Sequence, residues 1–417
     1  MGKSKSPKAK CVNDPGMIVG IDVAKHKHFA KILFPDGSES QPFGFENHRK
    51  GFETFLAWLS FHRKRVPCDS IIVGLESTGH YWEPLAFFLE EIPGIQVVQV
   101  SPKHVKKAKE IYDNSPAKTD RKDAGVIALL IRMGRFQRLV LPKGPFAELR
   151  CYARFRERKI VELGVQRNLL HSLVDVVFPE YGSLFSKIEG KASLTILKHF
   201  TTPDHILHAG FQNLSQALHQ ASRGKLPAAC AKRLMEAAST TVGGKEGIEA
   251  TAFAIRNIVA SLERIQGEIA LIEAELARVL DRIPYVHPLL SIPGVGKITL
   301  AILLGEAGDL RRYHKAEELI KLAGLNLFEI SSGSHQGRRH ISKRGHPLLR
   351  KCLFFAALRT VKTGGAFREV YLRWTETNHM QKTKALVAIS RKLLGLLFAL
   401  VRDHVAYQPR RAEFRAA

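Results

Sequence analysis

Apolar residues spaced alternately three and four apart run through residues 255–279, and this seam limits what the chain can fold into. It consists of Ile255, Ile258, Leu262, Ile265, Ile269, Ile272, Leu276 and Val279. Such spacing predicts one long helix with a continuous apolar face, which the prolines at 284 and 288 end. Two partners would bury that face equally well: residues 148–178 of the same chain as an antiparallel pair, or a second molecule in a coiled coil. Either way, the helix is a spacer between two globular parts.

Before the spacer, segments with strand and helix patterns alternate from residue 17 to about 145. The patterns predict a strand pair at 17–34 with a turn at 35–37, strands at 70–75 and 95–100, and helices at 51–63, 82–89 and 124–131. This alternation implies an α/β domain with a mixed sheet. Residues 1–16 have the composition of a disordered basic tail.

From about residue 146 onward the patterns are mainly helical. A long helix rich in Arg and Lys extends to 181, a polar and mostly helical stretch follows to 247, and the last part is helical outside a Gly/Ser-rich loop at 331–337. We therefore expect an α/β fold joined to an all-α part. The expected divisions are a tail at 1–16, an α/β domain at 17–145, a helical and coiled-coil region at 146–285, and a C-terminal domain at 286–417.

The charge of the chain predicts a polyanionic partner. Lys and Arg number 64 against 39 Asp and Glu, a formal net charge of +25. Nucleic acid is the first candidate and an anionic membrane surface the second. No apolar run approaches the roughly 18 residues of a membrane span, and no signal-type apolar segment follows the basic N-terminus. The five cysteines form no CxxC pair, which argues against zinc and disulfides, so we expect a reduced cytosolic protein.

Four carboxylates in the α/β domain are placed as a metal site requires. Asp22 lies in the first strand, Glu76 ends the strand at 70–75, and Asp120 and Asp123 are three apart at the start of a predicted helix, on one face. Such oxygen ligands suit two Mg²⁺ (or Mn²⁺) ions, which stabilise the entering and leaving oxygens of a phosphodiester. Each acid alone has a simpler reading. The GIDVAK sequence around Asp22 also fits the first phosphate loop of an actin-like ATPase. Glu76 alone could be a solvated charge at a strand end, and Asp120 and Asp123 alone could be ordinary acids at a helix N-terminus.

Basic residues crowd the approach to these acids. They are Lys103, Lys106, Lys107, Lys109, Lys118, Arg121 and Lys122. A solvated helical face explains some of them. ATP needs only one or two cations, whereas a nucleic-acid strand uses many, so the charge favours nucleic acid over ATP.

The turn Ile292-Pro293-Gly294-Val295-Gly296-Lys297 is similar to the hairpin of helix-hairpin-helix modules. Gly294 and Gly296 let backbone N–H groups approach a phosphate at a helix N-terminus, beside Lys297. A plain turn between helices is the alternative.

Between Ile330 and Phe367 the chain has no Asp or Glu. The cations in this stretch are Arg338, Arg339, Lys343, Arg344, Arg350, Lys351, Arg359 and Lys362. Guanidinium groups lower the pKa of a hydroxyl and stabilise a pentavalent phosphorus, so a serine here fits a nucleophile. On chemistry alone, Ser331, Ser332 and Ser334 are equal candidates for the nucleophile. The alternative is that this serine-rich loop is only flexible and has no catalytic role.

Several motifs together resemble the transposases of the insertion-sequence 110 family, over roughly 17–145 and 285–365. They are GIDVAK, LEST, KTDRKDA, SIPGVGKITL and GLNLFEISSGSHQGRRHISKRGHPLLR. The resemblance implies a RuvC-like, ribonuclease-H-type domain with an Asp-Glu-Asp-Asp metal site, a coiled coil, and a C-terminal transposase domain with a catalytic serine. Carried over, the acids fall on Asp22, Glu76, Asp120 and Asp123, and the serine on Ser332. The family's Gly-Leu-x-Pro is replaced by Gly324-Leu325-Asn326-Leu327, which removes a proline ahead of the serine.

The resemblance also implies the reaction and its partners. DNA strands are cut and rejoined through a phosphoserine intermediate with Mg²⁺ assistance, in a homo-oligomer (dimer or tetramer) that combines the metal domain of one protomer with the serine of another. A structured guide RNA pairs with donor and target DNA, as in RNA-guided systems, and the complex is cytoplasmic, on the nucleoid. The alternative is a RuvC-like nuclease or junction resolvase without a covalent step. The residues expected to contact nucleic acid are Lys118, Arg121, Lys122, Gly294, Gly296, Lys297, Arg338, Arg339, Lys343, Arg344 and Arg350.

Overall fold

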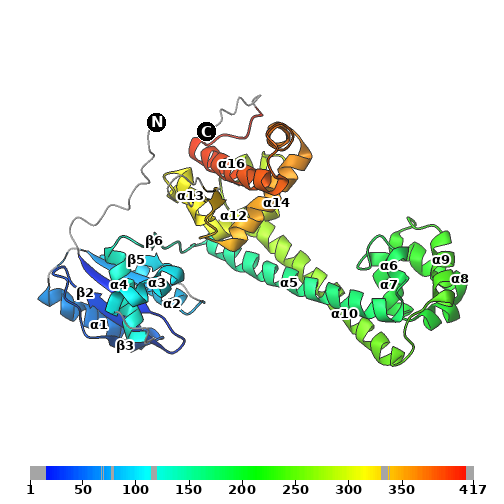
Figure 1. The fold of residues 1–417 in the computed structure, drawn as a ribbon, viewed down its shortest axis with the longest axis horizontal. Helices are drawn as coiled ribbons and strands as arrows, with labels where there is room; N and C mark the ends of the chain where they lie inside the picture. The colour runs from blue at the N-terminus through cyan, green and yellow to red at the C-terminus, as the bar shows by residue number, and fades with distance from the viewer. Residues whose placement is uncertain are drawn as a thin grey trace. The chain divides into compact units, whose positions relative to one another are not determined.

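The computed structural model describes residues 16–66, 68, 70–76, 79–113, 120–329, 337 and 339–409. For Glu110, Ile111, Asp113, Asp120, Arg121 and Arg138 it describes the backbone only. The chain separates into two compact units, residues 1–141 and 142–417 (Figure 1).

The first unit is built on a six-stranded mixed sheet, as the alternating pattern predicts. In the order β3-β2-β1-β4-β5-β6, β1, β4 and β5 are parallel, while β2 pairs antiparallel with both β1 and β3, and β6 pairs antiparallel with β5. The strands are β1 Met17–Asp22, β2 Lys27–Leu33, β3 Phe43–Glu46, β4 Ile71–Glu76, β5 Ile95–Val100 and β6 Gln137–Arg138. The helices are α1 Arg49–Arg65, α2 Glu83–Glu90, α3 Pro102–Asp113 and α4 Asp120–Arg132. β3 and β6 were not predicted from the sequence.

Helices cover both faces of this sheet, and side-chain alternation along β1 and β4 assigns each residue to a face. Odd-numbered residues such as Val19 and Val73 pack in one core with α1 and α2, whereas Ile18 and Ile72 pack in the other core with α3 and α4. The register partners Gly20 and Gly74 lie on the α4 face. A Cβ atom at Gly20 would lie 2.1 Å from the carbonyl oxygen of Ala124, so glycine is what lets α4 approach the sheet.

The second unit contains a pair of long helices, α5 Pro145–Val177 and α10 Ile248–Leu280. All eight seam positions of α10 are buried. Ion pairs join Arg156 to Glu273, Lys159 to Glu268 and Glu162 to Arg264 across the two helices, and Glu148 pairs with Arg282 just past the end of α10. Residue numbers rise on one helix as they fall on the other, so the pair is antiparallel. The seam is therefore covered within the chain, as the first of the two alternatives predicts.

Four shorter helices pack at one end of this pair (Figure 1). They are α6 Tyr181–Leu184, α7 Lys191–His199, α8 Pro203–Ser222 and α9 Ala229–Thr240. Their core includes Leu170 and Val174 of α5 and Ile258 and Leu262 of α10. At its centre, the fully buried Tyr181 donates its hydroxyl hydrogen to the carbonyl oxygen of Ser193 at 2.9 Å.

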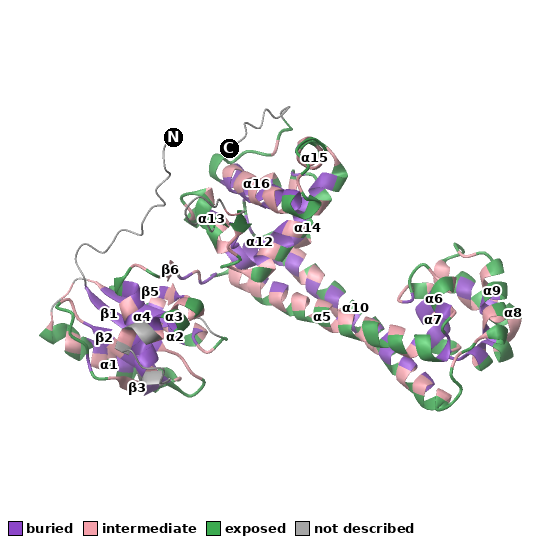
Figure 2. Cartoon of the chain, viewed as in Figure 1, coloured by how far each residue is buried: buried purple, intermediate pink, exposed green. Residues whose placement is uncertain are grey.

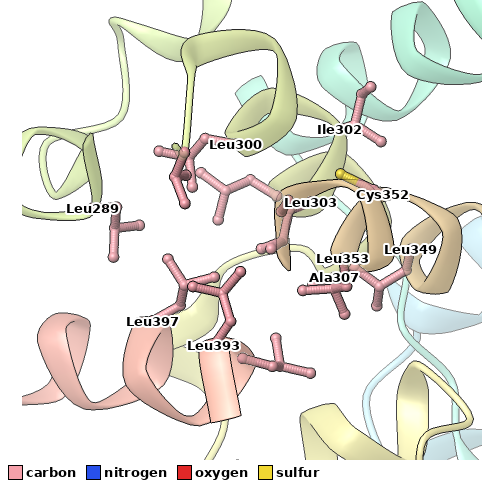
Figure 3. Packing of buried hydrophobic residues seen from close by; sticks show 14 of the residues in the cluster. Leu289, Leu300, Ile302, Leu303, Ala307, Leu349, Cys352, Leu353, Leu393 and Leu397 are labelled. Carbon is pink, nitrogen blue, oxygen red and sulfur yellow. The ribbon is translucent and has the colours of Figure 1, made fainter. Parts of the chain in front are cut away.

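A helical lobe packs at the other end. Its elements are α11 Val286–Leu290, α12 Lys297–Ala307, η1 Leu310–Arg312, α13 Ala316–Leu322, β7 Leu327–Phe328, β8 His340–Ile341, α14 Pro347–Thr363, α15 Ala366–Leu372, η2 Arg373–Thr377 and α16 Lys382–Asp403. Every residue of α12 from Thr299 to Ala307 is buried, because α5, α10, α14 and α11 all contact it (Figure 2). Leu303 of α12, Leu353 of α14 and Leu393 of α16 meet in this core (Figure 3).

Among the helices that the structure describes, none combines the length and apolar character needed to cross a membrane.

Candidate active site

Asp22 and Glu76 lie at the ends of two neighbouring parallel strands. Asp22 is the last residue of β1 and Glu76 the last of β4. The register runs from Met17 opposite Ile71 to Ile21 opposite Leu75, so one further step brings Asp22 level with Glu76. Because register partners in a parallel pair point to the same face, both carboxylates lie on the α4 side of the sheet. Both residues are half-buried.

The N-terminus of α4 lies at the same edge. Gly20 contacts the backbone of Ala124 near the start of α4. At the other end of the helix, the guanidinium of Arg132 donates to the carbonyl oxygens of Phe34 and Pro35 at 3.4 and 3.3 Å, beside the beginning of β1. α4 therefore runs opposite to β1, and its first turn, which begins at Asp120 as predicted, points toward the edge that carries Asp22 and Glu76. A helix N-terminus is partially positive and favours negative groups nearby.

Asp123, in this first turn, has one oxygen that is satisfied and one that is not. It is 5% exposed. Its Oδ2 accepts from Nζ of Lys109 on α3 at 2.5 Å, while its buried Oδ1 has no hydrogen-bond partner in the described part of the chain. An unpartnered buried carboxylate oxygen is costly unless another group supplies positive charge. This is the property expected of a metal ligand.

The acids do not form a closed cluster among the side chains that the structure describes, a set that leaves out Asp120. Within that set, no three His, Cys, Asp or Glu residues come together as a group that could hold a metal ion. Carboxylate oxygens are nevertheless the ligand type that Mg²⁺ prefers, and it keeps several waters beside one or two of them. The donor chemistry and the orphan oxygen of Asp123 therefore fit a hard divalent cation.

A polar cluster that the sequence did not reveal holds α3 against β2. Lys31 of β2 donates to the hydroxyl of Tyr112 at 2.9 Å, and Tyr112 donates to Oε2 of Glu39 at 2.6 Å. Lys31 also pairs with Glu39. Burial raises the pKa of Tyr112. Since Lys109 lies on the same helix as Tyr112, this cluster fixes the cation that contacts Asp123.

The predicted cations near the acids have different environments. Lys122 is buried within α4, whereas Lys103, Lys106 and Lys107 are exposed on α3. Lys118 lies outside the described residues, and Arg121 is described by its backbone only.

Ser331, Ser332, Ser334 and Arg338 also lie outside the described residues. The chain on either side of them forms a two-stranded ladder, in which Leu327 of β7 pairs with Ile341 of β8. Below the ladder, Ser342 donates its hydroxyl hydrogen to Oδ1 of Asn326 at 2.5 Å. We refer to residues 327–341, which contain β7, β8 and the chain between them, as the serine hairpin, and Leu327 of β7 stands at the position where the resemblance predicts proline.

The expected cations around this hairpin are partly engaged by the protein itself. Arg339 contacts Oε2 of Glu329 at 3.2 Å. Arg350 donates to the carbonyl oxygen of Ala323 at 3.0 Å, so part of its guanidinium holds the base of the hairpin. Lys343 has a left-handed backbone with a φ of 52°.

A buried carboxylate connects this hairpin to α5. Glu306 of α12 is 2% exposed, and its oxygens contact Nε of Arg154 at 2.9 Å and Nδ1 of His346 at 2.8 Å. Burial by itself raises the pKa of Glu306, but the hydrogen bond with His346 and the charge of Arg154 outweigh it and lower the pKa to about 2. His346 directly precedes α14 and follows the hairpin. The signal for Glu306 was a single acid within the apolar sequence LAILLGEA.

The glycine-containing turn lies between α11 and α12. Gly294 has a φ of +86°, and a Cβ atom there would lie 2.6 Å from the backbone nitrogen of Thr360. Close packing on α14 therefore explains why position 294 is a glycine. Gly296 is the N-cap of α12 and faces open space. Lys297 pairs with Asp281 at 2.8 Å.

Both parts of the chain match known families. Residues 19–179 match the family of IS110-type DEDD transposases, and residues 286–372 match the family described as transposase IS116/IS110/IS902. The protein of insertion element IS110 from Streptomyces coelicolor is 24% identical over 407 residues, covering 95% of this chain and 96% of the relative. The chain belongs to the IS110 family of transposases. As an IS110-family transposase it is a DNA-processing enzyme of an insertion element.

Two further relatives cover nearly the same length of this transposase. The protein of insertion element IS116 from Streptomyces clavuligerus is 27% identical over 395 residues, 94% of this chain and 96% of the relative. The pilin gene-inverting protein of Moraxella bovis is 25% identical over 398 residues, 94% and 98%. In this transposase the four acids lie within the first family match and the serine segment within the second.

Proposed function

We propose that this transposase cuts and rejoins DNA through a phosphoserine intermediate on Ser332, in a site that also uses Asp22, Glu76, Asp120 and Asp123. The proposed metal site is supported by the sheet edge that carries Asp22 and Glu76 and toward which the first turn of α4 points, together with the unpartnered Oδ1 of Asp123. The match of residues 19–179 to a family named for its DEDD acids supports the same set.

In the first step the hydroxyl oxygen of Ser332 attacks a backbone phosphorus. A bond forms between serine and phosphorus, the bond from phosphorus to one sugar oxygen breaks, and that oxygen leaves as a hydroxyl after taking a proton. In the second step a sugar hydroxyl of another strand attacks the same phosphorus and releases serine. The number of phosphodiester bonds is conserved, so rejoining needs no external energy source.

Asp22, Glu76, Asp120 and Asp123 would hold Mg²⁺ (or Mn²⁺). When bound, the ion supplies positive charge next to the phosphate oxygens. The acids themselves set its position, with Asp22 and Glu76 fixed by the sheet and Asp123 by α4. Arg339, Lys343 and Arg344 flank the serine hairpin, where they would neutralise the charge that develops on phosphorus.

We further propose that the RuvC-like domain, residues 17–145, acts with the serine domain, residues 286–417, of another protomer in a dimer or tetramer. A structured guide RNA would choose donor and target DNA by base pairing, on the nucleoid in the cytoplasm. The charge of +25 supports binding of this much nucleic acid. The helical region, 146–285, would serve as the spacer between these domains.

The test uses purified full-length protein, its element DNA with labelled strands, and the RNA that copurifies with it. A protein–DNA adduct that survives denaturing electrophoresis is expected for the parent chain, Ser331→Ala and Ser334→Ala, but not for Ser332→Ala. Asp22→Asn is expected to abolish both adduct and cleavage. Cleavage that persists in Ser332→Ala, with no adduct in any variant, would instead mean hydrolysis by a metal nuclease or junction resolvase.

A further inference from the structure

A cavity of about 370 Å³ in the second unit is lined by residues of α5, α10, α12 and α14, and none of the four acids is among its lining residues. Three helices contribute cations to its walls: Arg156 from α5, Lys297 from the start of α12, and Lys351 and Arg359 from α14. The buried side chains of Ile302 and Cys352 also line it.

The charges around this cavity do not cancel. Glu157 and Glu273 also line it, and each is already paired, with Lys351 and with Arg156. Arg359 differs, because its Nη1 donates to the neutral hydroxyl of Thr299 at 2.7 Å and no carboxylate in the described part of the chain pairs with it. A guanidinium that faces a cavity and has no carboxylate partner can bind two oxygens of a phosphate at once.

The start of α12 adds backbone donors beside Arg359. Gly296 is the N-cap, no side chain caps the helix, and the space next to Gly296 is open. The close packing of Gly294 on Thr360 holds this turn against the residue that follows Arg359. The first N–H groups of a helix have no partners within it, so they attract an anion alongside the guanidinium.

An aromatic side chain stands at the same cavity. Phe355 of α14 lines it and is 45% exposed. Ile298 and Leu348 add further apolar surface. A cationic cavity with an accessible aromatic ring is the combination that binds unpaired nucleotides, because the backbone contacts the cations while a base stacks on the ring.

We propose that this cavity holds one unpaired nucleotide of a nucleic-acid strand, with its phosphate between Arg359 and the start of α12 and its base against Phe355. The proposal rests on the proposed function only in that the substrate is nucleic acid. DNA and RNA share the chemistry that the cavity recognises, and the source is decided by experiment.

The base contact is tested by fluorescence anisotropy with labelled oligothymidylate, on full-length protein. Phe355→Ala is expected to weaken binding by roughly tenfold, which is within the range of one base–aromatic stack, and to leave the salt dependence unchanged. Phe355→Tyr is expected to bind like the parent chain. The matched control is Phe253→Ala, which removes an even more exposed ring (65%) from α10 and is expected to have no effect.

The phosphate contact is tested by the slope of log affinity against log salt. Arg359→Gln is expected to reduce the magnitude of the slope by about 0.7, the value for one contact to a single strand. Lys315→Gln, an exposed cation of the same lobe outside the cavity, is the control and is expected to leave the slope unchanged. Equal effects of the two variants would show a general effect of charge and overturn the proposal.

Three probes distinguish the sources of the nucleotide. A loss in Phe355→Ala confined to oligothymidylate assigns the cavity to DNA, a loss confined to oligouridylate assigns it to RNA, and equal losses show that it accepts both. No loss with either probe overturns the proposal. An equal loss with a blunt duplex overturns the requirement for an unpaired base. Because these assays measure binding and not cleavage, failure of the phosphoserine chemistry, read from adducts, does not alter these results. Thermal melts of each variant report whether the fold is kept.

Discussion

Arg154 on α5 and Glu306 on α12 are joined by an ion pair of 2.9 Å from Nε to Oε1. The carboxylate is buried, and its other oxygen contacts His346 at 2.8 Å. One acid therefore links the long helix pair to the residue at which the serine hairpin returns to α14. The position of that hairpin depends on a contact far from it in sequence.

Removing the charge of Glu306 is expected to destabilise the second unit. Glu306→Gln removes the buried negative charge that Arg154 and His346 both contact. We expect a loss of about 2 kcal/mol, less than for a fully buried pair because the Arg154 side chain is 43% exposed. Urea denaturation followed by circular dichroism measures it. Glu273→Gln, which removes a carboxylate that is 35% exposed from its pair with Arg156, is expected to cost less, and an equal cost would contradict the role of carboxylate burial.

The same carboxylate predicts a pH dependence. The folded pKa of Glu306 is about 2, below the unfolded value of about 4.3. A lowered pKa contributes stability that is complete above the unfolded pKa and is lost as pH falls toward the folded pKa. The parent chain should therefore lose stability between about pH 4.5 and 2 more steeply than Glu306→Gln. Parallel curves for the two chains, from melting temperatures over this range, would count against the assignment.

Glycine at position 20 is expected to be required for the contact between α4 and β1. In Gly20→Ala the new methyl group would lie 2.1 Å from the carbonyl oxygen of Ala124, and overpacking of this kind costs about 1–3 kcal/mol. The matched control is Gly164→Ala in α5, where a Cβ atom meets nothing within 4 Å. That variant should gain about 0.5–1 kcal/mol, because alanine is the better helix former. Chemical denaturation distinguishes the expected loss of stability in Gly20→Ala from the expected gain in Gly164→Ala.

Added Mn²⁺ is expected to raise the melting temperature of the parent chain, since a ligand that binds only the folded state stabilises it. Asp123→Asn should reduce this increase strongly, because it removes a charge whose Oδ1 is buried without a partner. Differential scanning calorimetry with and without Mn²⁺ measures the shift. Glu53→Gln, on the exposed face of α1, should keep the full increase. If Asp123→Asn keeps it as well, the acid is not a ligand.

The elements that the sequence predicted best are those with a repeated pattern of their own. The seam of α10 consists of eight regularly spaced apolar residues, and buried strands such as Ile71–Glu76 are short apolar runs. β3 and β6 have four and two residues, too few for a period, and they exist because a neighbouring strand offers free backbone groups. The choice of α5 as partner for α10 likewise depends on the tertiary fold.

Only some features of the candidate site could likewise be predicted from local sequence. The placement of Asp22 and Glu76 at strand ends follows from local pattern, because each ends an apolar run. The meeting of Glu306, Arg154 and His346 does not, since the three residues are separated by long stretches of chain. Likewise, the sequence motif predicted that Gly294 approaches a phosphate, while its packing depends on Thr360, a residue more than sixty positions later in the chain.

The antiparallel pairing of α5 and α10 constrains how this protein can change in evolution. Each helix has 33 residues, about 50 Å at 1.5 Å per residue. An insertion in α5 alone would shift Arg156 and Lys159 past their acidic partners and rotate the apolar face of α10 away from its cover. The spacer can lengthen or shorten only if two separate stretches of the gene gain or lose matching segments together. The lengths of α5 and α10 must therefore change together, although distant parts of the gene encode them.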